Sequence, residues 1–379
     1  MGAALALRGA DRLADWRSRL VADPRFQRWA ARSPLTRWIA RRRARALFDL
    51  CAGFVYSQIL AACVELDLFE RLRDGPKEVR ALAAQMGLEP DAARRLLKGA
   101  AALRLIRSRS GDRYGLDDLG AAMLGNPGVA PFVAHHRLLY EDLADPVPRL
   151  RGQGRTALSR FWPYAANAPG RPSAEGDGDG GSAAYSALMS RTQTLVAEAV
   201  LDSYPFGRHR RLLDVGGGEG RFLAAVAERA PALCLTLFDL PSVAARARGL
   251  LAARGLDGRV ELVGGDCLRD PLPRGADVAT LVRVLHDHDD ESARIILSAI
   301  HAALPPGGAL VVAEPMAGVS GAERMGDAYF GFYLLAMGRG RPRTPDEIAA
   351  LLREAGFTGI RRLRTPDPLV VSAILAVVA

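Results

Sequence analysis

A glycine-rich turn is the first feature of this sequence that could bind a ligand. It runs Asp214-Val-Gly-Gly-Gly-Glu-Gly220 and directly follows a short apolar run. Because Gly216 and Gly218 have no side chains, a ligand can approach the backbone at the start of the following helix. The dinucleotide pattern G-x-G-x-x-G requires glycine five residues after Gly216, where Arg221 stands instead. The turn therefore predicts a ligand site and disfavours a nicotinamide cofactor.

Acidic residues follow two further apolar runs in the same part of the chain. Asp239 ends one run, and Asp266, followed by Cys267, comes just after the next. If these runs are parallel strands, their carboxyl ends meet at one edge of a sheet, beside the glycine turn. One carboxylate can then accept hydrogen bonds from two ribose hydroxyls, and another from an adenine amino group. Together with Asp214, these residues suit a cationic nucleoside without phosphates.

The sequence from residue 211 onward predicts the sheet that positions these groups. Short apolar runs alternate with helical patterns of about a dozen residues, which is typical of a doubly wound α/β sheet. A later helix is expected at Thr344-Pro-Asp-Glu347, where Thr and Glu form a capping box, and the chain ends in a β-prone stretch at 369–378. The runs expected to form parallel strands are 211–216, 233–239, 260–263, 277–282 and 309–314.

The front half predicts a smaller, mainly helical domain. Residues 44–72 form a long apolar stretch that needs a partner helix, within the fold or across a dimer. Helical patterns at 79–87 and 91–106, then a hairpin tip at 108–114, have the order of a winged helix. The second of these helices carries few cations, such as Arg94, Arg95 and Lys98, among many alanines and leucines. We therefore expect no nucleic acid partner, and keep a DNA-binding regulator as the alternative.

The composition is that of a globular protein with an unusual front end. The 379 residues are 49% hydrophobic and 25% charged, with a net charge of +9. Residues 1–43 hold eleven Arg and three Asp, net +8, whereas the rest of the chain holds 40 basic and 39 acidic side chains, net +1. The segment 37–48 interleaves aromatic and cationic side chains. This suits an anionic membrane surface, although a solvated helix face is the simpler interpretation.

The remaining features bear on compartment and domain organisation. The longest uncharged stretch near the front, 50–64, has 15 residues and is too short to span a bilayer, and no signal-peptide core precedes it. Four isolated cysteines favour reduced thiols over disulfides or a zinc site. We therefore expect a cytoplasmic protein without a metal. A turn-rich flexible loop at 169–182 separates a basic extension at 1–43 and a helical domain at 44–168 from a nucleoside-binding domain at 183–379.

Taken together, these motifs resemble the class I S-adenosylmethionine methyltransferases, specifically the two-domain small-molecule O-methyltransferases with a winged-helix dimerisation domain. The resemblance covers roughly residues 44–379. It implies S-adenosyl-L-methionine as cofactor, a ribose on Asp239, an adenine flanked by Asp266 and Cys267, and a homodimer formed by the front domain. An α/β domain that binds another nucleoside is the alternative. The residues implied to contact the cofactor are Asp214, Gly216, Gly218, Asp239, Leu240, Asp266, Cys267 and Arg283.

The residues after the fourth predicted strand indicate the reaction. Arg283-Val-Leu-His-Asp-His288 is similar to the family's base motif, in which Asp follows His, and differs from the Asn/Asp-Pro-Pro-aromatic motif of enzymes that methylate nucleic acid amino groups. The resemblance makes His286 the general base for the acceptor hydroxyl, and an unperturbed pKa of ~6.5 leaves it mostly neutral at pH 7. Glu314 matches the carboxylate that orients this His. His288 is expected on the solvent side, and the cluster lacks a closed set of metal ligands.

One position departs from the family pattern. Pro342 stands before Arg343-Thr344 where relatives often carry Glu, so a second orienting carboxylate is missing or comes from elsewhere. Candidate acceptor contacts come from the aromatic strip 329–337, although such a strip is more often simply core, and from one methionine before the sheet. These candidates are Met189, Tyr329, Phe332 and Tyr333.

Within the family, the chain resembles the carotenoid O-methyltransferases of purple photosynthetic bacteria. This similarity rests on the arginine-rich front and on the segments 48–58, 185–189, 208–216 and 283–288. It implies a hydrophobic acceptor, the tertiary 1-hydroxyl of an acyclic carotenoid, and gives the cationic front a role in peripheral contact with the inner membrane surface. The alternatives are O-methylation of a polyketide phenol, C-methylation of a bacteriochlorophyll precursor, and a scaffold that binds the cofactor without transferring its methyl group.

Overall fold

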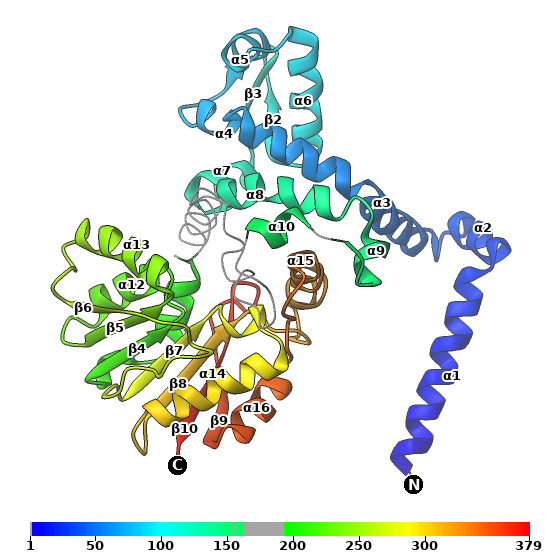
Figure 1. Cartoon of the computed structure of the whole chain (residues 1–379). Helices are drawn as coiled ribbons and strands as arrows, with labels where there is room; N and C mark the ends of the chain where they lie inside the picture. Colours follow the sequence, from blue (N-terminus) through cyan, green and yellow to red (C-terminus); the bar gives the residue numbers. More distant parts are fainter. Residues whose placement is uncertain (1, 127, 155, 162–192, 194) are drawn as a thin grey trace. The chain divides into compact units, whose positions relative to one another are not determined.

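Two compact units make up the chain in the computed structural model, which describes residues 2–126, 128–154, 156–161, 193 and 195–379 (Figure 1). The units are Met1–Leu124 and Gly125–Ala379. The predicted loop 169–182 lies outside the described residues, so the boundaries expected at 168 and 183 stay predictions.

The first unit contains helices and one small sheet. Strands β1, β3 and β2 form an antiparallel three-stranded sheet in that order, next to helices α5 and α6 (Figure 1). Its elements are α1 (Gly2–Ala22), α2 (Pro24–Arg32), α3 (Arg37–Glu65), α4 (Leu68–Arg71), β1 (Lys77–Glu78), α5 (Val79–Met86), α6 (Pro90–Ala102), β2 (Ile106–Arg109), β3 (Arg113–Leu116) and α7 (Asp118–Gly125).

The helix, turn, helix and wing expected from the sequence are present. Helix α5 ends at Gly87, whose φ of +66° is the left-handed conformation that glycine adopts readily. Buried Leu82 and Leu97 join α5 and α6 to a core that includes Ile106 of β2. On α6, Arg94 donates to Asp112 in the wing at 2.7 Å. One of the few cations of this helix is thus engaged within the domain.

Helix α3 is the long apolar helix expected from the sequence, and much of it is exposed in this chain. It is the one described helix that is long and apolar enough, by length and composition, to cross a membrane. This differs from the expectation that no segment is long enough to span a bilayer, because the apolar part of α3 continues beyond the uncharged stretch 50–64 and includes a few charged residues. Leu47, Phe48, Leu50 and Phe54 are all exposed. An exposed apolar surface of this kind indicates contact with another apolar surface. A second subunit provides such a surface, and so does a bilayer.

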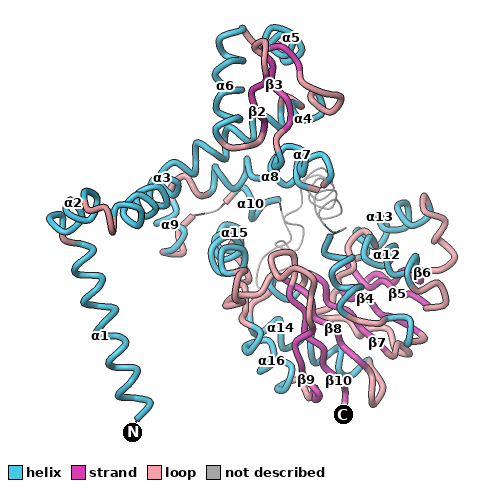
Figure 2. The backbone as a smooth tube through the Cα atoms, turned by 180° about the vertical axis from the view of Figure 1, so that it is seen from behind, coloured by secondary structure: helices cyan, strands magenta, loops and turns pink. Residues whose placement is uncertain are grey.

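The second unit is built on a seven-stranded sheet in the order β6-β5-β4-β7-β8-β10-β9 (Figure 2). The five strands from β6 to β8 are parallel, as expected, whereas β10 runs antiparallel between β8 and β9. Strand β4 lies between β5, which follows it in the sequence, and β7. The order reverses there, and ligands of doubly wound sheets bind beside such a reversal.

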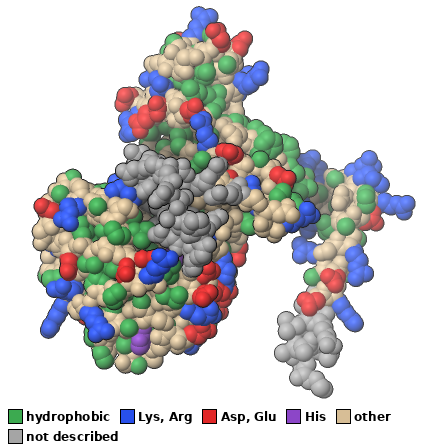
Figure 3. Space-filling model, in the orientation of Figure 1, with side chains coloured by type: hydrophobic (Ala, Val, Ile, Leu, Met, Phe, Trp, Pro, Cys, Tyr) green, Lys and Arg blue, Asp and Glu red, His purple; other side chains and the backbone are tan. Residues whose placement is uncertain are grey.

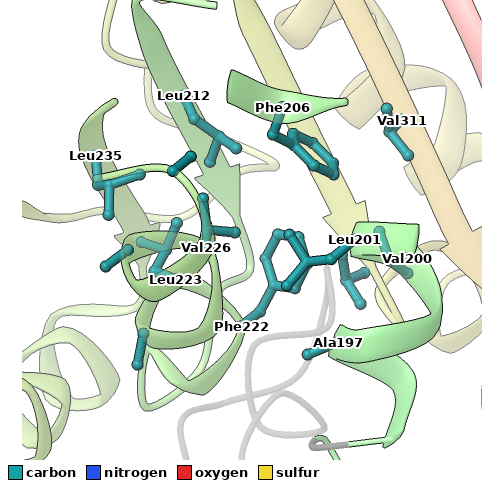
Figure 4. Close-up of a cluster of buried hydrophobic side chains, with 14 of the residues drawn as sticks. Ala197, Val200, Leu201, Phe206, Leu212, Phe222, Leu223, Val226, Leu235 and Val311 are labelled. Carbon is teal, nitrogen blue, oxygen red and sulfur yellow. The ribbon is translucent and has the colours of Figure 1, made fainter. Parts of the chain in front are cut away.

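Alternating side chains fill the cores on the two faces of the sheet. Leu212 belongs to the cluster that includes α12 and α13, and Leu213 belongs to the cluster that includes α14 and α16. In the first cluster, Phe222 of α12 packs near Phe206, with ring centroids 6.0 Å apart (Figure 4). The fold is therefore the Rossmann-like α/β sheet that the alternation predicts.

The boundaries of the second unit's elements agree closely with the strand predictions. The capping box of α16 is also present, with Thr344 and Glu347 bonded reciprocally. The elements are α8 (Val129–Asp142), α9 (Pro146–Leu150), α10 (Ala157–Phe161), η2 (Phe206–Arg208), β4 (Arg211–Val215), α12 (Arg221–Arg229), β5 (Cys234–Asp239), α13 (Pro241–Ala252), β6 (Val260–Gly264), β7 (Val278–Val282), η3 (Leu285–Asp287), α14 (Asp290–Ala303), β8 (Ala309–Glu314), the π-helical η4 (Arg324–Phe330), α15 (Gly331–Met337), α16 (Pro345–Glu354), β9 (Phe357–Leu363) and β10 (Ser372–Val378).

Candidate active site

The glycine turn after β4 requires glycine for two different reasons. Gly216, Gly218 and Gly220 all have positive φ, between +58° and +80°, where other residues are strained. At Gly216 a Cβ atom would also lie 2.7 Å from Cγ2 of Val284, which leaves no room for a side chain. At Gly218 a Cβ atom would meet nothing within 4 Å. The first glycine thus permits close packing, and Gly218 borders open space where a ligand can approach the backbone.

Asp239 at the end of β5 holds this turn in place. Its Oδ2 accepts a hydrogen bond from the Gly218 backbone N–H at 2.8 Å, and its Oδ1 accepts from the Leu240 N–H at 2.7 Å. The side chain is buried. A carboxylate has about four acceptor positions, so it can accept from ligand hydroxyls as well as from backbone N–H groups. The structure therefore brings Asp239 to the glycine turn, as the sequence predicts.

Asp214 at the end of β4 contributes a second buried carboxyl group. Its Oδ1 accepts from the Thr280 hydroxyl at 2.7 Å, whereas its Oδ2 is buried without a partner. Burial raises the pKa of Asp214 to about 7, with Thr280 opposing the shift and the charge of Asp239 adding to it. An unpartnered buried oxygen beside a glycine turn fits a ligand that supplies a donor or a positive charge.

The third predicted acidic strand end lies at the same edge. Asp266 follows β6, and its Oδ1 accepts from the Leu268 N–H at 2.9 Å. Burial, with the charges of Asp266 and Asp239, raises the pKa of the Cys267 thiol to about 12, so the thiol stays neutral. Gly265 is required here, because a Cβ atom would lie 2.6 Å from the Phe238 ring.

The turn after β7 carries the candidate base. Arg283 begins it with a φ of +60°, which is uncommon for a residue with a side chain and is typical of functional turns. Its backbone N–H donates to the Ala313 carbonyl at 2.8 Å, which ties the turn to β8. The short η3 helix follows and places His286 in a buried position.

His286 lies between two carboxylates. Its Nδ1 is 3.4 Å from Oε2 of Glu314, and its Nε2 is 3.2 Å from Oδ1 of Asp287. The same Glu314 oxygen accepts from the His286 backbone N–H at 3.0 Å, while Oε1 of Glu314 is buried without a partner. Glu314 thus lies where the predicted orienting carboxylate is required. Asp287 is a second carboxylate beside the imidazole, on its Nε2 side, whereas Pro342 supplies none.

These carboxylates control the proton affinity of the imidazole. Burial lowers the pKa of His286, but the charges and hydrogen bonds of Asp287 and Glu314 outweigh it and raise the pKa to about 9. His286 is therefore a stronger base than a free imidazole, but its ring is mostly protonated at pH 7, which corrects the expectation of a mostly neutral imidazole. His288 is also buried, which corrects the expectation that it lies on the solvent side, and burial lowers its pKa.

Aromatic side chains from η4 and α15 lie next to His286. The rings of His286 and Phe330 meet edge to face with centroids 5.6 Å apart, and Phe330 contacts Tyr329 and Tyr333. Burial raises the pKa of both tyrosines, with the charge of Asp287 adding to the shift at Tyr333. The predicted acceptor residues Tyr329 and Tyr333 thus lie near the imidazole. Phe332 is 40% exposed, and Met189 lies outside the described residues.

Helix α8 supplies partners that the sequence analysis missed. His135 Nε2 lies 2.9 Å from the Tyr333 hydroxyl, and His136 Nε2 lies 2.8 Å from the Tyr329 hydroxyl. Burial lowers the pKa of both histidines, that of His135 to about 4, so both are neutral. With their hydroxyls engaged, the tyrosines present mainly their ring faces. Nearly two hundred residues separate these partners, so no local motif could have paired them.

Comparisons with known proteins decide the family. A model of the O-methyltransferase domain matches residues 140–358, and a model of the O-methyltransferase dimerisation domain matches residues 48–126. The chain belongs to the O-methyltransferase family. Demethylspheroidene O-methyltransferase of Cereibacter sphaeroides is 46% identical over 359 residues, covering 95% of this chain and 93% of that protein. Its namesake from Rhodobacter capsulatus is 42% identical, with 95% and 88% covered.

Solved structures agree with this O-methyltransferase assignment. Human N-acetylserotonin methyltransferase in complex with SAM has a TM-score of 0.74 and 26% identity, covering 89% of this chain and 98% of that one. The SAH-bound calicheamicin methyltransferase CalO1 has a TM-score of 0.69 and 29% identity, covering the same shares. The family uses S-adenosylmethionine as methyl donor, and this chain is an O-methyltransferase of that kind. Its dimerisation domain supports a homodimer.

Proposed function

We propose that this O-methyltransferase methylates the tertiary 1-hydroxyl of an acyclic carotenoid in the spheroidene pathway. The identity to two demethylspheroidene O-methyltransferases along nearly the whole chain carries this proposal. The aromatic surroundings of His286, in which His135 and His136 already bond the tyrosine hydroxyls, support an apolar acceptor. A base with a raised pKa also suits an aliphatic alcohol, which is a much weaker acid than a phenol.

The cofactor side of the site follows from the carboxyl edge of the sheet. S-adenosylmethionine supplies a methyl group made electrophilic by its positive sulfur. We assign Asp239 to the ribose hydroxyls, Asp266 and Cys267 to the adenine, and the glycine turn with Asp214 to the rest of the donor. Leu240 and Arg283 flank the same edge and complete the assigned contacts. The unpartnered Oδ2 of Asp214 and the open space at Gly218 support this arrangement.

On the acceptor side, His286 handles the hydroxyl proton. In the deprotonated, neutral ring Glu314 holds the Nδ1 hydrogen, so Nε2 is the nitrogen that takes the proton as the acceptor oxygen bonds to the methyl carbon and the carbon–sulfur bond breaks. The imidazolium that results is stabilised by Glu314 and Asp287 together. Most of the remaining acceleration comes from holding oxygen, carbon and sulfur in line.

Product analysis tests this proposal directly. Purified protein is incubated with methyl-labelled S-adenosylmethionine and, separately, with a 1-hydroxylated acyclic carotenoid, a polyketide phenol and a chlorin. We expect label in the carotenoid, as a methoxy group at carbon 1. The proposal fails if only the phenol or the chlorin is labelled. Donor binding without transfer to any of the three would instead favour the scaffold alternative.

We also propose that the enzyme works in the cytoplasm, in peripheral contact with the inner membrane surface where a carotenoid is dissolved. The exposed tryptophans Trp16, Trp29 and Trp38 lie on α1, α2 and α3, each about 60% exposed. Arginines surround them, and Figure 3 shows these cations along the N-terminal helices. Because residues 1–43 carry a net +8, two copies of this surface would repel each other. Four free cysteines fit a reducing compartment.

Vesicle sedimentation tests the membrane contact. We expect the enzyme to sediment with phosphatidylglycerol vesicles and only weakly with phosphatidylcholine vesicles, and high salt to weaken the binding. A variant with Ser at Trp16, Trp29 and Trp38 should bind at least tenfold more weakly, whereas Ile295→Ser, an exposed apolar change on α14, should not. Wild-type sedimentation by the triple variant would contradict the proposal. A change in the oligomeric state of the triple variant without a change in its sedimentation with vesicles would also contradict it.

A further inference from the structure

Arg343 is a charged side chain buried completely beside the turn that carries His286. Its relative exposure is 0%, the lowest of the charged groups together with Glu314 among the described residues. A buried guanidinium is costly unless every donor is used. Here Nε and Nη2 donate to Oδ1 of Asp290 at 2.9 and 2.7 Å. The charge is thus neutralised by the first residue of α14.

The other bonds of this guanidinium lie on both sides of His286. Nη1 donates to the carbonyl of Leu285 at 2.7 Å, and Nη2 donates to the carbonyl of His288 at 2.7 Å. One rigid planar group therefore fixes the backbone immediately before the imidazole and two residues after it. The ammonium group of a lysine cannot make the same set of hydrogen bonds, because its donors do not form a planar fork.

The residues just before Arg343 contact the same turn. The backbone N–H of Arg341 donates to the His286 carbonyl at 2.9 Å. Gly340 lies so close that a Cβ atom there would be 2.2 Å from that carbonyl oxygen, and its φ of +77° also requires glycine. The carbonyl oxygens of residues 285, 286 and 288 are thus all held by the segment 340–343.

Arg343 is itself fixed by two elements of the sheet unit. It precedes Thr344, the N-cap of α16, whose capping box with Glu347 sets the start of that helix. Its carbonyl accepts from the Ala317 N–H at 2.9 Å, three residues beyond Glu314 at the end of β8. Arg343 therefore connects the turn that carries His286 with the chain that follows Glu314.

We propose that Arg343 is a positioning residue for methyl transfer, which holds the turn 285–288 so that the His286 ring stays aligned with Glu314 and with the acceptor oxygen. This rests on the proposed role of His286 as base. The guanidinium does not face the reacting atoms and carries no proton in the reaction. Its effect is on the geometry, where displacement of a reacting group by about 1 Å reduces rates by roughly a hundredfold.

Arg343→Lys tests this proposal, since it keeps the charge and loses the fork. We expect kcat to fall by about 10- to 100-fold, with the dissociation constant for S-adenosylmethionine within twofold of wild type. We also expect the pH dependence of kcat and the 15N signals of the His286 ring to change, because the distances to Asp287 and Glu314 change. Asp290→Asn retains an acceptor for Nε and should show a smaller loss of the same kind. Arg294→Met, which removes an exposed ion pair with Glu354, is the matched control.

The result that overturns the proposal is a loss of thermal stability without a change in the catalytic pH profile or in the ring signals. Wild-type kcat in Arg343→Lys overturns it as well. Failure of the proposed base is distinguishable, because His286→Ala would then retain turnover whatever Arg343→Lys does. Arg343→Lys is preferred to Arg343→Ala, since the alanine variant leaves Asp290 and two carbonyls without their donor and is expected to fold poorly.

Discussion

Replacing His286 with alanine is expected to reduce methyl transfer by about 10²- to 10⁴-fold, the range typical for loss of a general base. The imidazole is buried and flanked by Glu314 and Asp287, so water cannot easily replace it. The glycine turn and Asp239 belong to other strands. Binding of S-adenosylmethionine should therefore stay within a few-fold of wild type. Single-turnover transfer from labelled donor gives the rate, and calorimetry gives the donor affinity.

Glu291→Ala is a suitable control for this experiment. Glu291 is exposed in the first turn of α14, five residues after His286, and bonds to nothing in the catalytic turn. Its replacement should leave both rate and affinity unchanged. Retained turnover in His286→Ala would mean that another group takes the proton. Loss of donor affinity together with turnover would mean that the imidazole belongs to the cofactor site.

The pH dependence gives an independent check on the same base. Because the pKa of His286 is raised to about 9, the imidazole is mostly protonated at pH 7 and becomes available as the pH rises. The rate of transfer should therefore increase about tenfold per pH unit below that pKa and level off above it. Asp287→Asn removes one of the two charges that raise the pKa, so its profile should move to lower pH. A profile that is flat from pH 7 to 9 in the wild type would contradict the assignment.

The sheet was predictable because its signals are local. Five apolar runs of strand length, separated by helical patterns, correspond to β4 to β8 with end shifts of one residue or so. The antiparallel position of β10 was not predictable, because the β-prone stretch 369–378 has no local feature that sets its direction. Strand β9, Phe357–Leu363, was missed because its apolar residues are spaced three apart and separated by polar and cationic ones, without the period-2 alternation of a half-buried strand, at an edge of the sheet.

The site was predictable where a residue's neighbours in sequence create its environment. The glycine turn and Asp239 are of this kind, because the ends of adjacent parallel strands must meet. The role of Asp287 is different. Its position beside His286 was visible, but whether its carboxylate turns toward Nε2 depends on the conformation of η3. The buried Arg343 and the histidines of α8 depend on contacts between distant segments, which no spacing within one segment can indicate.

Replacing Asp239 with asparagine is expected to weaken binding of S-adenosylmethionine by about a hundredfold or more. The two carboxylate oxygens accept from the N–H groups of Gly218 and Leu240, and an amide offers only one oxygen for the two. One backbone donor is then left facing an NH₂ group, and an unsatisfied buried donor costs about 1–3 kcal/mol. The loss of acceptors for the ribose hydroxyls adds to this. Calorimetric titration with the donor measures the sum.

The loss from the backbone donor left unsatisfied and the loss from the ribose contacts can be separated with a modified ligand. Wild-type enzyme should bind a 2′-deoxy analogue of S-adenosylhomocysteine more weakly than S-adenosylhomocysteine itself, whereas Asp239→Asn should discriminate much less between the two. Equal discrimination by both proteins would mean that Asp239 only organises the glycine turn, and that the ribose lies elsewhere. Asp257→Asn, an exposed change before β6, should alter neither affinity. Because the proposal assigns Asp239 to the donor and His286 to the acceptor, the double variant should show the affinity loss of one and the rate loss of the other, close to additively.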